Sequence, residues 1–521
     1  MSHNASHNPL LRHRLRALLS RSPAMAMLGI PGLALAGPTG EDVIRGQADV
    51  ARPDANNTII KQYTDRAVIN WQTFNVDADE YVIFNQLDAS SIVLNRVLGG
   101  DASAILGHIE ANGQVFLLNP QGVFFTHGAS LDVQGFLAST LDMDPDAFMA
   151  GDFTLTRSAG APDTARVIND GHITAGPGGY VVLAGDYTEN TGIITAHAGT
   201  VALVAGNALT LDIEGDGLVS FTVDEAALSE AAGVRNAGSL IADGGRVIMT
   251  AKVASDLVAT AVNNEGLVRA HSIEELGGEI YLVGHGGDVA NSGTLDADGE
   301  NADGGGIAIY SDRDVTLADG GVQTAAGDEN HEGGVIRAIA EEHLDYQKDN
   351  LIRVTGGMSG GFVEVSGHGS IALRGIPQIG AGGTFLIDPT NINIIDGTGS
   401  GNIPIGSIGT VEDAYIERQL NLNVNVILAA SSSVTAGSGV SITANTGSAD
   451  LTIGIGALSG SSCTTCAGAN SSFCFGPGVT FNQFGNGTID LTGVDIDIRG
   501  DLTIQAASLD GNLIVGNVTA G

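Results

Sequence analysis

The sequence predicts an all-β protein built as a β-solenoid, and three observations support this fold class. Glycine accounts for 75 of the 521 residues and aromatic residues for 5%, which is typical of a chain with many turns and few bulky core side chains. Apolar runs rich in Val, Ile, Leu and Phe are closed by Asn, Gly or Asp, a pattern that predicts short strands and tight turns. The third observation is an internal repeat.

From about residue 165 the chain repeats a phrase made of an Asn-x-Gly turn, a short apolar strand and a glycine-led second strand. The phrase starts at Asn169, Asn190, Asn236, Asn264 and Asn291, at intervals of 21, 46, 28 and 27 residues. Repeats of about 20 to 30 residues indicate a solenoid, because one repeat cannot bury its apolar face without neighbours. We interpret the interval of 46 as two repeats. A β-sandwich is the alternative, but it does not need the phrase to recur in phase.

Alternation along the strands predicts which side chains face the interior. Successive residues of a strand point to opposite faces, so Val247 and Met249 lie opposite Arg246 and Ile248. Near the end of the chain, Asp495 and Asp497 alternate with apolar residues and are expected to point outward. We interpret outward acids as solubility residues rather than the carboxylate pair of a glycan-active enzyme.

The first 36 residues have the pattern of a secretory signal peptide. A basic stretch at residues 12–21 precedes an apolar run at residues 25–36, which ends in the small-residue sequence Ala-Leu-Ala. This run is too short to anchor a chain permanently in a bilayer. We therefore expect residues 1–36 to direct export and to be removed.

The charge of the chain excludes one class of partner. There are 22 Lys and Arg against 59 Asp and Glu, giving a net charge of -37, so the phosphates of nucleic acid would be repelled. The acidity suits the solubility of an elongated surface protein. We expect no nucleic-acid partner.

Residues 71–140 hold unusual short motifs between strand-like runs. They include Trp-Gln-Thr-Phe-Asn from residue 71, Asn95-Arg96-Val97, Ile-Leu-Gly-His-Ile from residue 105, Ala-Asn-Gly-Gln-Val-Phe-Leu from residue 111 and Gly-Phe-Leu-Ala-Ser-Thr from residue 135. Between the last two stands Asn119-Pro120-Gln121-Gly122. This tetrapeptide predicts a β-turn, because proline fixes φ at its second position and glycine tolerates positive φ at its last.

In this order and spacing, the motifs resemble the N-terminal secretion domain (haemagglutination activity domain) of the two-partner secretion exoproteins, the filamentous haemagglutinin family of Gram-negative bacteria. The resemblance covers residues 37–285 and implies a right-handed parallel β-helix with extra-helical strands near the N-terminus. It also implies export through the periplasm and a partner transporter, an Omp85-type outer-membrane β-barrel with periplasmic domains. The chain would then be secreted or held at the cell surface.

The resemblance also implies roles for six residues. Family members usually carry Asn-Pro-Asn-Gly where this chain has Asn-Pro-Gln-Gly. For this sequence, the resemblance implies a role in transporter recognition, or in the local fold on which recognition depends, for Asn95, Arg96, Asn119, Pro120, Gln121 and Gly122. Asparagines that cap turns can serve folding alone, so both roles stay open.

Two other motifs bear on catalysis and metal binding. Gly-Met-Ser-Gly-Gly at residues 357–361 matches a nucleophile elbow, but it has no strand-to-helix context and is interpreted as a turn. Cys463 and Cys466 have the spacing of a redox pair or of metal ligands, and Cys474 is near. No histidine lies close by to complete a zinc site, and the chain is exported to an oxidising compartment, so a disulfide is favoured, either between Cys463 and Cys466 or elsewhere in this loop, with one thiol left over. We expect no enzyme activity, cofactor or metal.

The predicted organisation is a signal peptide at 1–36, a secretion domain at 37–285 and a β-helical shaft at 286–521 that is truncated. A long acidic β-helix without a catalytic constellation suits adhesion to a host or neighbouring cell. The alternatives are capture of haem or a haem carrier, which needs an exposed His or Tyr on a loop, and the N-terminal part of a contact-dependent toxin. A glycan-active β-helix enzyme is less favoured.

Overall fold

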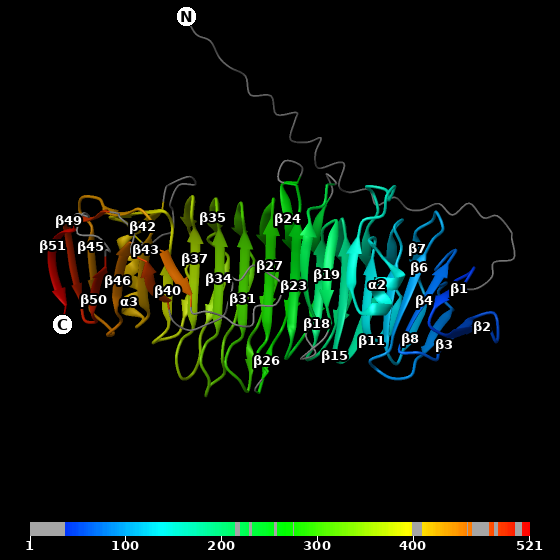
Figure 1. Cartoon of the computed structure of the whole chain (residues 1–521). Helices are drawn as coiled ribbons and strands as arrows, with labels where there is room; N and C mark the ends of the chain where they lie inside the picture. The colour runs from blue at the N-terminus through cyan, green and yellow to red at the C-terminus, as the bar shows by residue number, and fades with distance from the viewer. Residues whose placement is uncertain are drawn as a thin grey trace, which may run out of the picture. The chain divides into compact units, whose positions relative to one another are not determined.

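The computed structural model describes residues 37–213, 219–228, 232–254, 258–274, 276–398, 409–455, 457–460, 479–483, 488–505 and 513–520. The predicted signal peptide and the predicted Cys463–Cys466 disulfide lie outside these residues. From residue 37 onward the chain winds into coils of short strands, and equivalent strands of successive coils lie side by side (Figure 1). The predicted all-β parallel β-helix is confirmed.

One face of the helix is a ten-stranded parallel sheet. Its strands are β7 (Ser103–Ile105), β10 (Val123–Phe125), β14 (Val167–Asn169), β16 (Tyr187–Asn190), β21 (Gly233–Asn236), β24 (Thr260–Asn264), β28 (Asp288–Asn291), β32 (Val315–Leu317), β35 (His343–Tyr346) and β38 (Ser370–Leu373).

The other two faces form one sheet, because β11 (Ser130–Ser139) and β15 (His172–Gly185) continue from the second face round a corner into the third. The second face also contains β3 (Asn57–Gln62), β5 (Tyr81–Asn85), β8 (His108–Ala111), β17 (Ile193–Thr195), β22 (Ser239–Ile241), β25 (Leu267–Arg269), β29 (Thr294–Asp296), β33 (Val322–Thr324), β36 (Leu351–Val354) and β39 (Gln378–Ile379). The third face also contains β4 (Arg66–Trp71), β6 (Ile92–Val97), β9 (Gln114–Leu118), β18 (Thr200–Ala205), β23 (Arg246–Lys252), β27 (Glu279–His285), β31 (Gly306–Ser311), β34 (Val335–Ala340), β37 (Phe362–Gly367), β40 (Thr384–Ile387), β43 (Asn425–Ala430), β46 (Leu451–Ile455) and β50 (Leu502–Gln505).

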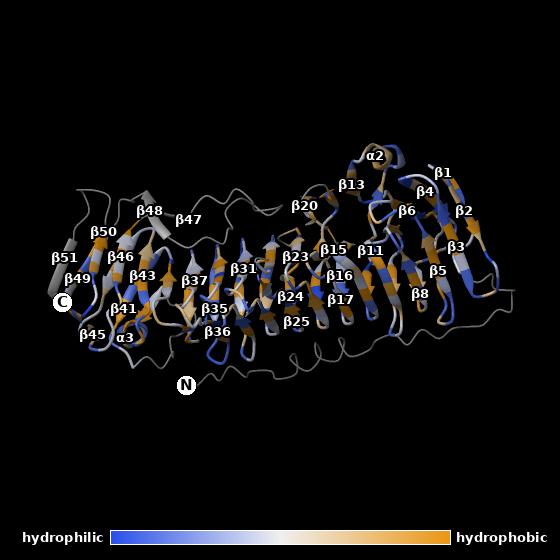
Figure 2. Cartoon of the chain, turned by 90° about the horizontal axis from the view of Figure 1, so that it is seen from below, coloured by the Kyte–Doolittle hydropathy of each residue, from blue (hydrophilic) through white to orange (hydrophobic). Residues whose placement is uncertain are grey.

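The interior follows the predicted alternation. Val247 and Met249 are fully buried in the core between the three faces, whereas Arg246 and Ile248 point outward. Hydrophobic and hydrophilic residues accordingly alternate along the strands (Figure 2). Asp495 and Asp497 are exposed, as predicted, while Ile496 between them is buried.

The repeated Asn-x-Gly phrase builds a ladder of buried amides along one corner. The side chains of Asn169, Asn190, Asn236, Asn264 and Asn291 are all fully buried. The Nδ2 of each of the first four donates to the Oδ1 of the next asparagine along the series, at 2.8, 2.9, 2.8 and 2.7 Å. A buried amide is costly unless its hydrogen bonds are made. The ladder supplies those bonds only when neighbouring coils are stacked in register.

The interpretation of the 46-residue interval as two repeats is wrong. Asn190 and Asn236 are direct neighbours in the ladder, so the interval is one coil with an insertion. The insertion supplies β19 (Ala208–Asp212) and β20 (Ser220–Glu225), which leave the helix and pair antiparallel with each other. With β12 (Asp142–Met143) and β13 (Phe153–Thr156) they form a four-stranded extra-helical sheet.

The extra-helical sheet gives the domain a second apolar core, on the outer side of the third face. It is joined by helix α2 (Pro145–Ala150). Phe116 of β9, Phe148 of α2 and Phe153 of β13 meet edge to face, with ring centroids 5.8 to 6.0 Å apart. Nearer the N-terminus, β1 (Asp42–Arg45) and β2 (Ala48–Ala51) pair antiparallel with β4 and β3. The predicted extra-helical strands are therefore present.

Toward the C-terminus the third face continues, while the first face changes. The ten-stranded sheet ends at β38, and a second sheet follows, with β41 (Asn391–Ile395), β42 (Thr410–Glu412), β44 (Ser433–Ala436), β45 (Ser441–Ala444), β49 (Thr488–Ile498) and β51 (Leu513–Ala520). Helix α3 (Asp413–Asn421) lies between β42 and β43 and buries Tyr415, Ile416 and Leu420. Two further pairs are small: β26 (Ser272–Ile273) with β30 (Gly299–Glu300), and β47 (Ala457–Gly460) with β48 (Val479–Gln483).

Asp388, which follows β40, makes the fold sensitive to pH. Burial, reinforced by Glu364 and opposed by His368, raises the pKa of Asp388 to about 7. The folded chain therefore holds a proton that the unfolded chain has lost between about pH 4 and pH 7, so stability falls as pH rises through this window.

Replacing Asp388 by asparagine removes the charge and is expected to stabilise the protein at pH 8 by about 2 to 4 kcal/mol. At pH 4 the two proteins should be nearly equal. The measurement is the urea unfolding midpoint at both pH values, with the exposed Asp497→Asn as the control. A midpoint that falls equally in wild type and Asp388→Asn between pH 4 and pH 8 would contradict the assignment.

Candidate functional site

The predicted turn at residues 119–122 is present and closes by a backbone hydrogen bond. The N–H of Gly122 donates to the carbonyl of Asn119 at 3.0 Å. Gly122 has φ +123°, and a Cβ there would lie 3.0 Å from the ring of Phe124. The backbone angle therefore favours glycine at the last position, and a larger residue would also crowd the Phe124 ring. The turn joins β9 on the third face to β10 on the first.

Asn119 is the structural centre of this turn. Its side chain is fully buried. The Nδ2 donates to the carbonyl of Asp101 and to Oγ of Ser103, both at 3.0 Å. The Oδ1 accepts the N–H of Gln121 at 2.9 Å. One amide thus fixes its own turn and ties it to the start of β7 and the residues just before it, in the preceding coil.

Asn95, also fully buried, lies one coil earlier and is paired in register with Leu117. Its Oδ1 accepts the indole N–H of Trp71 at 2.9 Å, and its Nδ2 donates to the carbonyl of Phe116 at 3.1 Å. These bonds connect β4, β6 and β9, which are successive strands of the third face. Trp71, which begins the first of the sequence motifs, is therefore hydrogen-bonded to Asn95, which begins the second.

Arg96 points to the opposite side of β6, toward the extra-helical sheet. Its Nε and Nη2 bind the two carboxylate oxygens of Asp142 at 2.8 and 2.6 Å. The hydrogen bonds with Asp142 raise the pKa of Arg96 above its ordinary value. A two-point Arg–carboxylate pair fixes geometry as well as charge. Arg96 thus anchors β12 to the third face of the helix.

The six predicted residues therefore lie together around the ends of β6 and β9. Pro120 and Gln121 are half-buried, whereas Asn95, Asn119 and Gly122 are buried. A partner that contacts the folded domain can reach Pro120 and Gln121 but not the amides of Asn95 and Asn119. Any influence of these two asparagines on a partner of the folded domain passes through the local fold.

A second feature was not predicted from the sequence. In four successive coils, the connection that forms the corner between the second and third faces is longer than in the neighbouring coils. The connections at residues 242–245, 270–278, 297–305, 325–334, 355–361 and 380–383 contain 4, 9, 9, 10, 7 and 4 residues. We call the four long connections the arm ledge. Each of the six ends in Gly-Gly, and a Cβ on the second glycine of the arm ledge connections at Gly305, Gly334 and Gly361 would lie 2.0 to 2.3 Å from a carbonyl of the preceding coil. These glycines let the coils stay stacked while the longer loops project.

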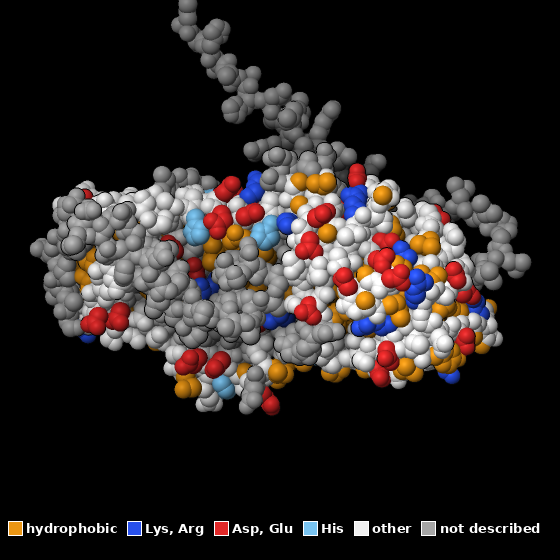
Figure 3. All heavy atoms as spheres, in the orientation of Figure 1, with side chains coloured by type: hydrophobic (Ala, Val, Ile, Leu, Met, Phe, Trp, Pro, Cys, Tyr) orange, Lys and Arg blue, Asp and Glu red, His pale blue; other side chains and the backbone are white. Residues whose placement is uncertain are grey.

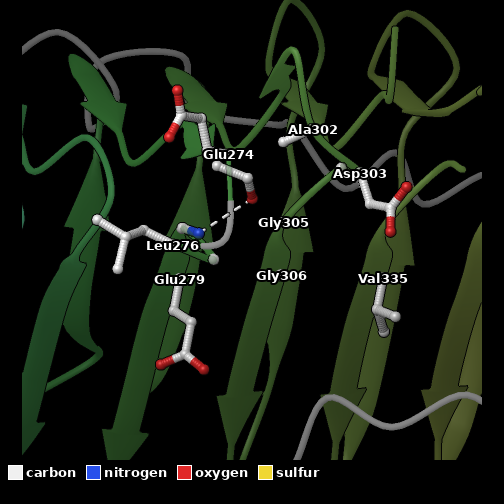
Figure 4. Close-up of a pocket in the computed structure, with 12 residues that line it drawn as sticks. Glu274, Leu276, Glu279, Ala302, Asp303, Gly305, Gly306 and Val335 are labelled. Atoms are coloured by element: carbon white, nitrogen blue, oxygen red, sulfur yellow. Dashed lines mark hydrogen bonds between the residues drawn. The ribbon is translucent and has the colours of Figure 1, made fainter. Parts of the chain in front are cut away.

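The arm ledge has an acidic hollow at its base. A pocket of about 420 Å³ is lined by Leu276, by glycine backbone and by the carboxylates of Glu274, Glu279 and Asp303 (Figure 4). Glu279 is paired with Arg246, its Oε2 2.7 Å from Nε. The hollow therefore offers carboxylates and exposed apolar surface together.

The structure also places the motifs considered for chemistry. Ser359 lies in the arm ledge, in the connection before β37, where it forms an isolated parallel bridge with Glu332 rather than the expected turn. The described residues contain no group of three or more His, Cys, Asp and Glu side chains arranged to hold a metal ion. Across the same residues, no helix has the length and apolar character needed to cross a membrane.

Comparison with known proteins identifies the family. The model of the TPS secretion domain matches residues 36–297. The crystal structure of the HMW1 secretion domain from Haemophilus influenzae superposes with a TM-score of 0.62 at 28% identity, and the match covers 75% of this chain and 100% of that domain.

Two heme/hemopexin-binding proteins of Haemophilus influenzae are also similar in sequence. One is 33% identical over 270 residues, which is 51% of this chain and 29% of that protein. The other is 28% identical over 268 residues, covering 47% of this chain and 28% of its own length. The chain thus spans less than a third of either relative. It belongs to the TPS secretion domain family and is a secreted β-helical exoprotein.

Proposed function

We propose that the exported β-helix acts as an adhesin and that the arm ledge is its binding surface for a host or neighbouring cell. The observation that carries the proposal is the local lengthening of one corner from four residues to between seven and ten. The ledge presents exposed Leu276 beside Glu274 and Asp303, with which it lines one pocket, and exposed Met358 on its last connection. Exposed apolar side chains rimmed by polar ones are typical of interaction sites.

For the transporter, we propose an Omp85-type β-barrel whose periplasmic domains read the segment around Asn95, Arg96 and the turn at residues 119–122. The buried hydrogen bonds of both asparagines support a role in forming the local fold. Pro120 and Gln121 are the members of the turn that a partner can contact directly.

A second candidate function is the capture of haem or of a haem-carrying protein. It is favoured by the names of the two relatives and by His331, which lies on a loop of the arm ledge with its side chain partly exposed. The matched stretch covers less than a third of each relative, so the likeness bears most directly on export.

The adhesion proposal is tested by trimming the ledge. In the trimmed variant each of the four long connections is replaced by Ala-Asp-Gly-Gly, the sequence of residues 242–245 that already closes this corner in the preceding coil. The secreted wild type is expected to bind cultured epithelial cells or bacterial cells in flow cytometry, and the trimmed variant to lose that binding. Equal secretion and circular dichroism of the two proteins are the control.

Unchanged cell binding by the folded, trimmed variant would overturn the assignment of the surface. Absence of cell binding by wild type, together with saturable binding of haemin or haem-loaded hemopexin, would replace adhesion by the second candidate.

A further inference from the structure

Two adjacent arms of the ledge place a histidine beside a methionine. The N–H of Gly357 donates to the carbonyl of Asp328 at 2.9 Å, and the N–H of Met358 donates to the carbonyl of His331 at 3.1 Å. The N–H of Gly333 donates to the carbonyl of Ser359 at 3.0 Å. The two loops are therefore joined like neighbouring strands, with His331 and Met358 at the same level.

The ring of His331 is oriented by a carboxylate. Its Nδ1 lies 2.6 Å from Oδ1 of Asp328. An ionised partner at Nδ1 keeps the proton there and directs the lone pair of Nε2 away from the loop. Carboxylate–histidine pairs of this kind support metal-ligating imidazoles in other proteins.

Met358 is unusual for its exposure. Its side chain is 70% exposed, more than any other large hydrophobic residue among those described. Burial of a methionine side chain stabilises the folded protein, and the exposed Met358 does not contribute in this way. An exposed thioether is instead free to act as a soft ligand, and such ligands select Cu(I).

We propose that His331 Nε2 and Met358 Sδ form a two-coordinate site for a soft monovalent cation, Cu(I), with Asp328 as the positioning residue. Bonds of about 2.0 Å to imidazole and about 2.3 Å to sulfur set the two ligand atoms about 4.3 Å apart across the ion. The parallel bridge between Glu332 and Ser359 puts His331 and Met358 in register, and neighbouring strands are about 4.8 Å apart, so the two side chains start from backbones at a similar separation.

The surroundings of the site favour a cation. Carboxylates of Asp328, Glu329 and Glu332 belong to the same arm, and the net charge of the chain is -37. Figure 3 shows Asp and Glu side chains spread over the visible face of the molecule, in keeping with this charge. Such a field raises the local concentration of a positive ion.

The test uses the secreted chain with its three cysteines replaced by serine, so that thiolates do not compete. Cu(I) is titrated anaerobically against a chromophoric chelator in four proteins: this background, His331→Gln, Met358→Leu and the control His197→Gln, which alters an exposed histidine on the short corner loop at residues 196–199. We expect one equivalent to bind in the background and in the control, and each of the other two variants to lose it.

Asp328→Asn is expected to weaken binding about tenfold or more while retaining the stoichiometry. X-ray absorption of the loaded background protein should show one nitrogen and one sulfur neighbour. Equal binding by all four titrated proteins, or a loss confined to one of the two ligand variants, would overturn the site. These readouts do not involve cell binding, so the result is independent of the adhesion proposal.

Discussion

Asn119→Ala is expected to destabilise the secretion domain by about 3 kcal/mol, because buried polar groups left without partners cost about 1 to 3 kcal/mol each. The substitution removes the acceptor of the Gln121 N–H and the donor to the Asp101 carbonyl and the Ser103 hydroxyl. The amount secreted should fall to a small fraction of wild type. Immunoblots of medium and periplasm, with the urea midpoint of the purified protein, measure both effects.

Gln121→Asn provides the matched control for this experiment. It restores the residue usual in the family at the third position of the turn, and the side chain of Gln121 is half-buried. Stability and secretion should both stay close to wild type. Normal secretion of Asn119→Ala would remove Asn119 from the secretion element, whatever its effect on the midpoint.

Asn236→Leu is expected to have an effect of similar size, since Asn236 occupies the middle of the amide ladder. The substitution removes the shortest of the three hydrogen bonds that Nδ2 of Asn190 donates, and it leaves Oδ1 of Asn264 without its donor. The expected cost is about 3 kcal/mol, as two buried amides lose partners. Urea unfolding followed by circular dichroism provides the measurement.

Asn291→Leu is the natural comparison, because Asn291 ends the ladder. It accepts from Asn264 but donates to no further asparagine, and its neighbour in the next coil is Leu317. A leucine thus already occupies this register position, and the expected cost is about 1 kcal/mol. If Asn236→Leu and Asn291→Leu lowered the free energy of unfolding by the same amount, the hydrogen bonds of the ladder would not act cooperatively.

The parts of the fold that follow from local chemistry could be predicted from the sequence. The turn at residues 119–122 follows from its proline and glycine, and the inward positions Val247 and Met249 follow from the period of a strand. Helix α2 could also have been predicted. Asp144 caps it by accepting from the N–H groups of Asp146 and Ala147, and Gly151 ends it at φ 89°; both are recognised helix signals.

Other parts depend on how the coils stack, and no local pattern contains them. The partners of Asn119 at Asp101 and Ser103 come from the previous coil, and Asp142 meets Arg96 across 46 residues. Strands β19 and β20 are short and partly apolar, as the strands of the coils are. The sequence alone therefore does not distinguish an insertion in the 46-residue interval from a second repeat. The arm ledge could be predicted only in part. The Gly-Gly pair that closes each long connection can be seen in the sequence, but the projection of the loops cannot.

The most direct test of the account is secretion of the full chain from a Gram-negative host with and without its cognate outer-membrane transporter. We predict that the mature protein reaches the medium or the cell surface only when the transporter is present, and that it is otherwise retained in the periplasm. Retention with the cognate transporter present, or equal secretion without it, would contradict the assignment of residues 36–297 as a working secretion domain.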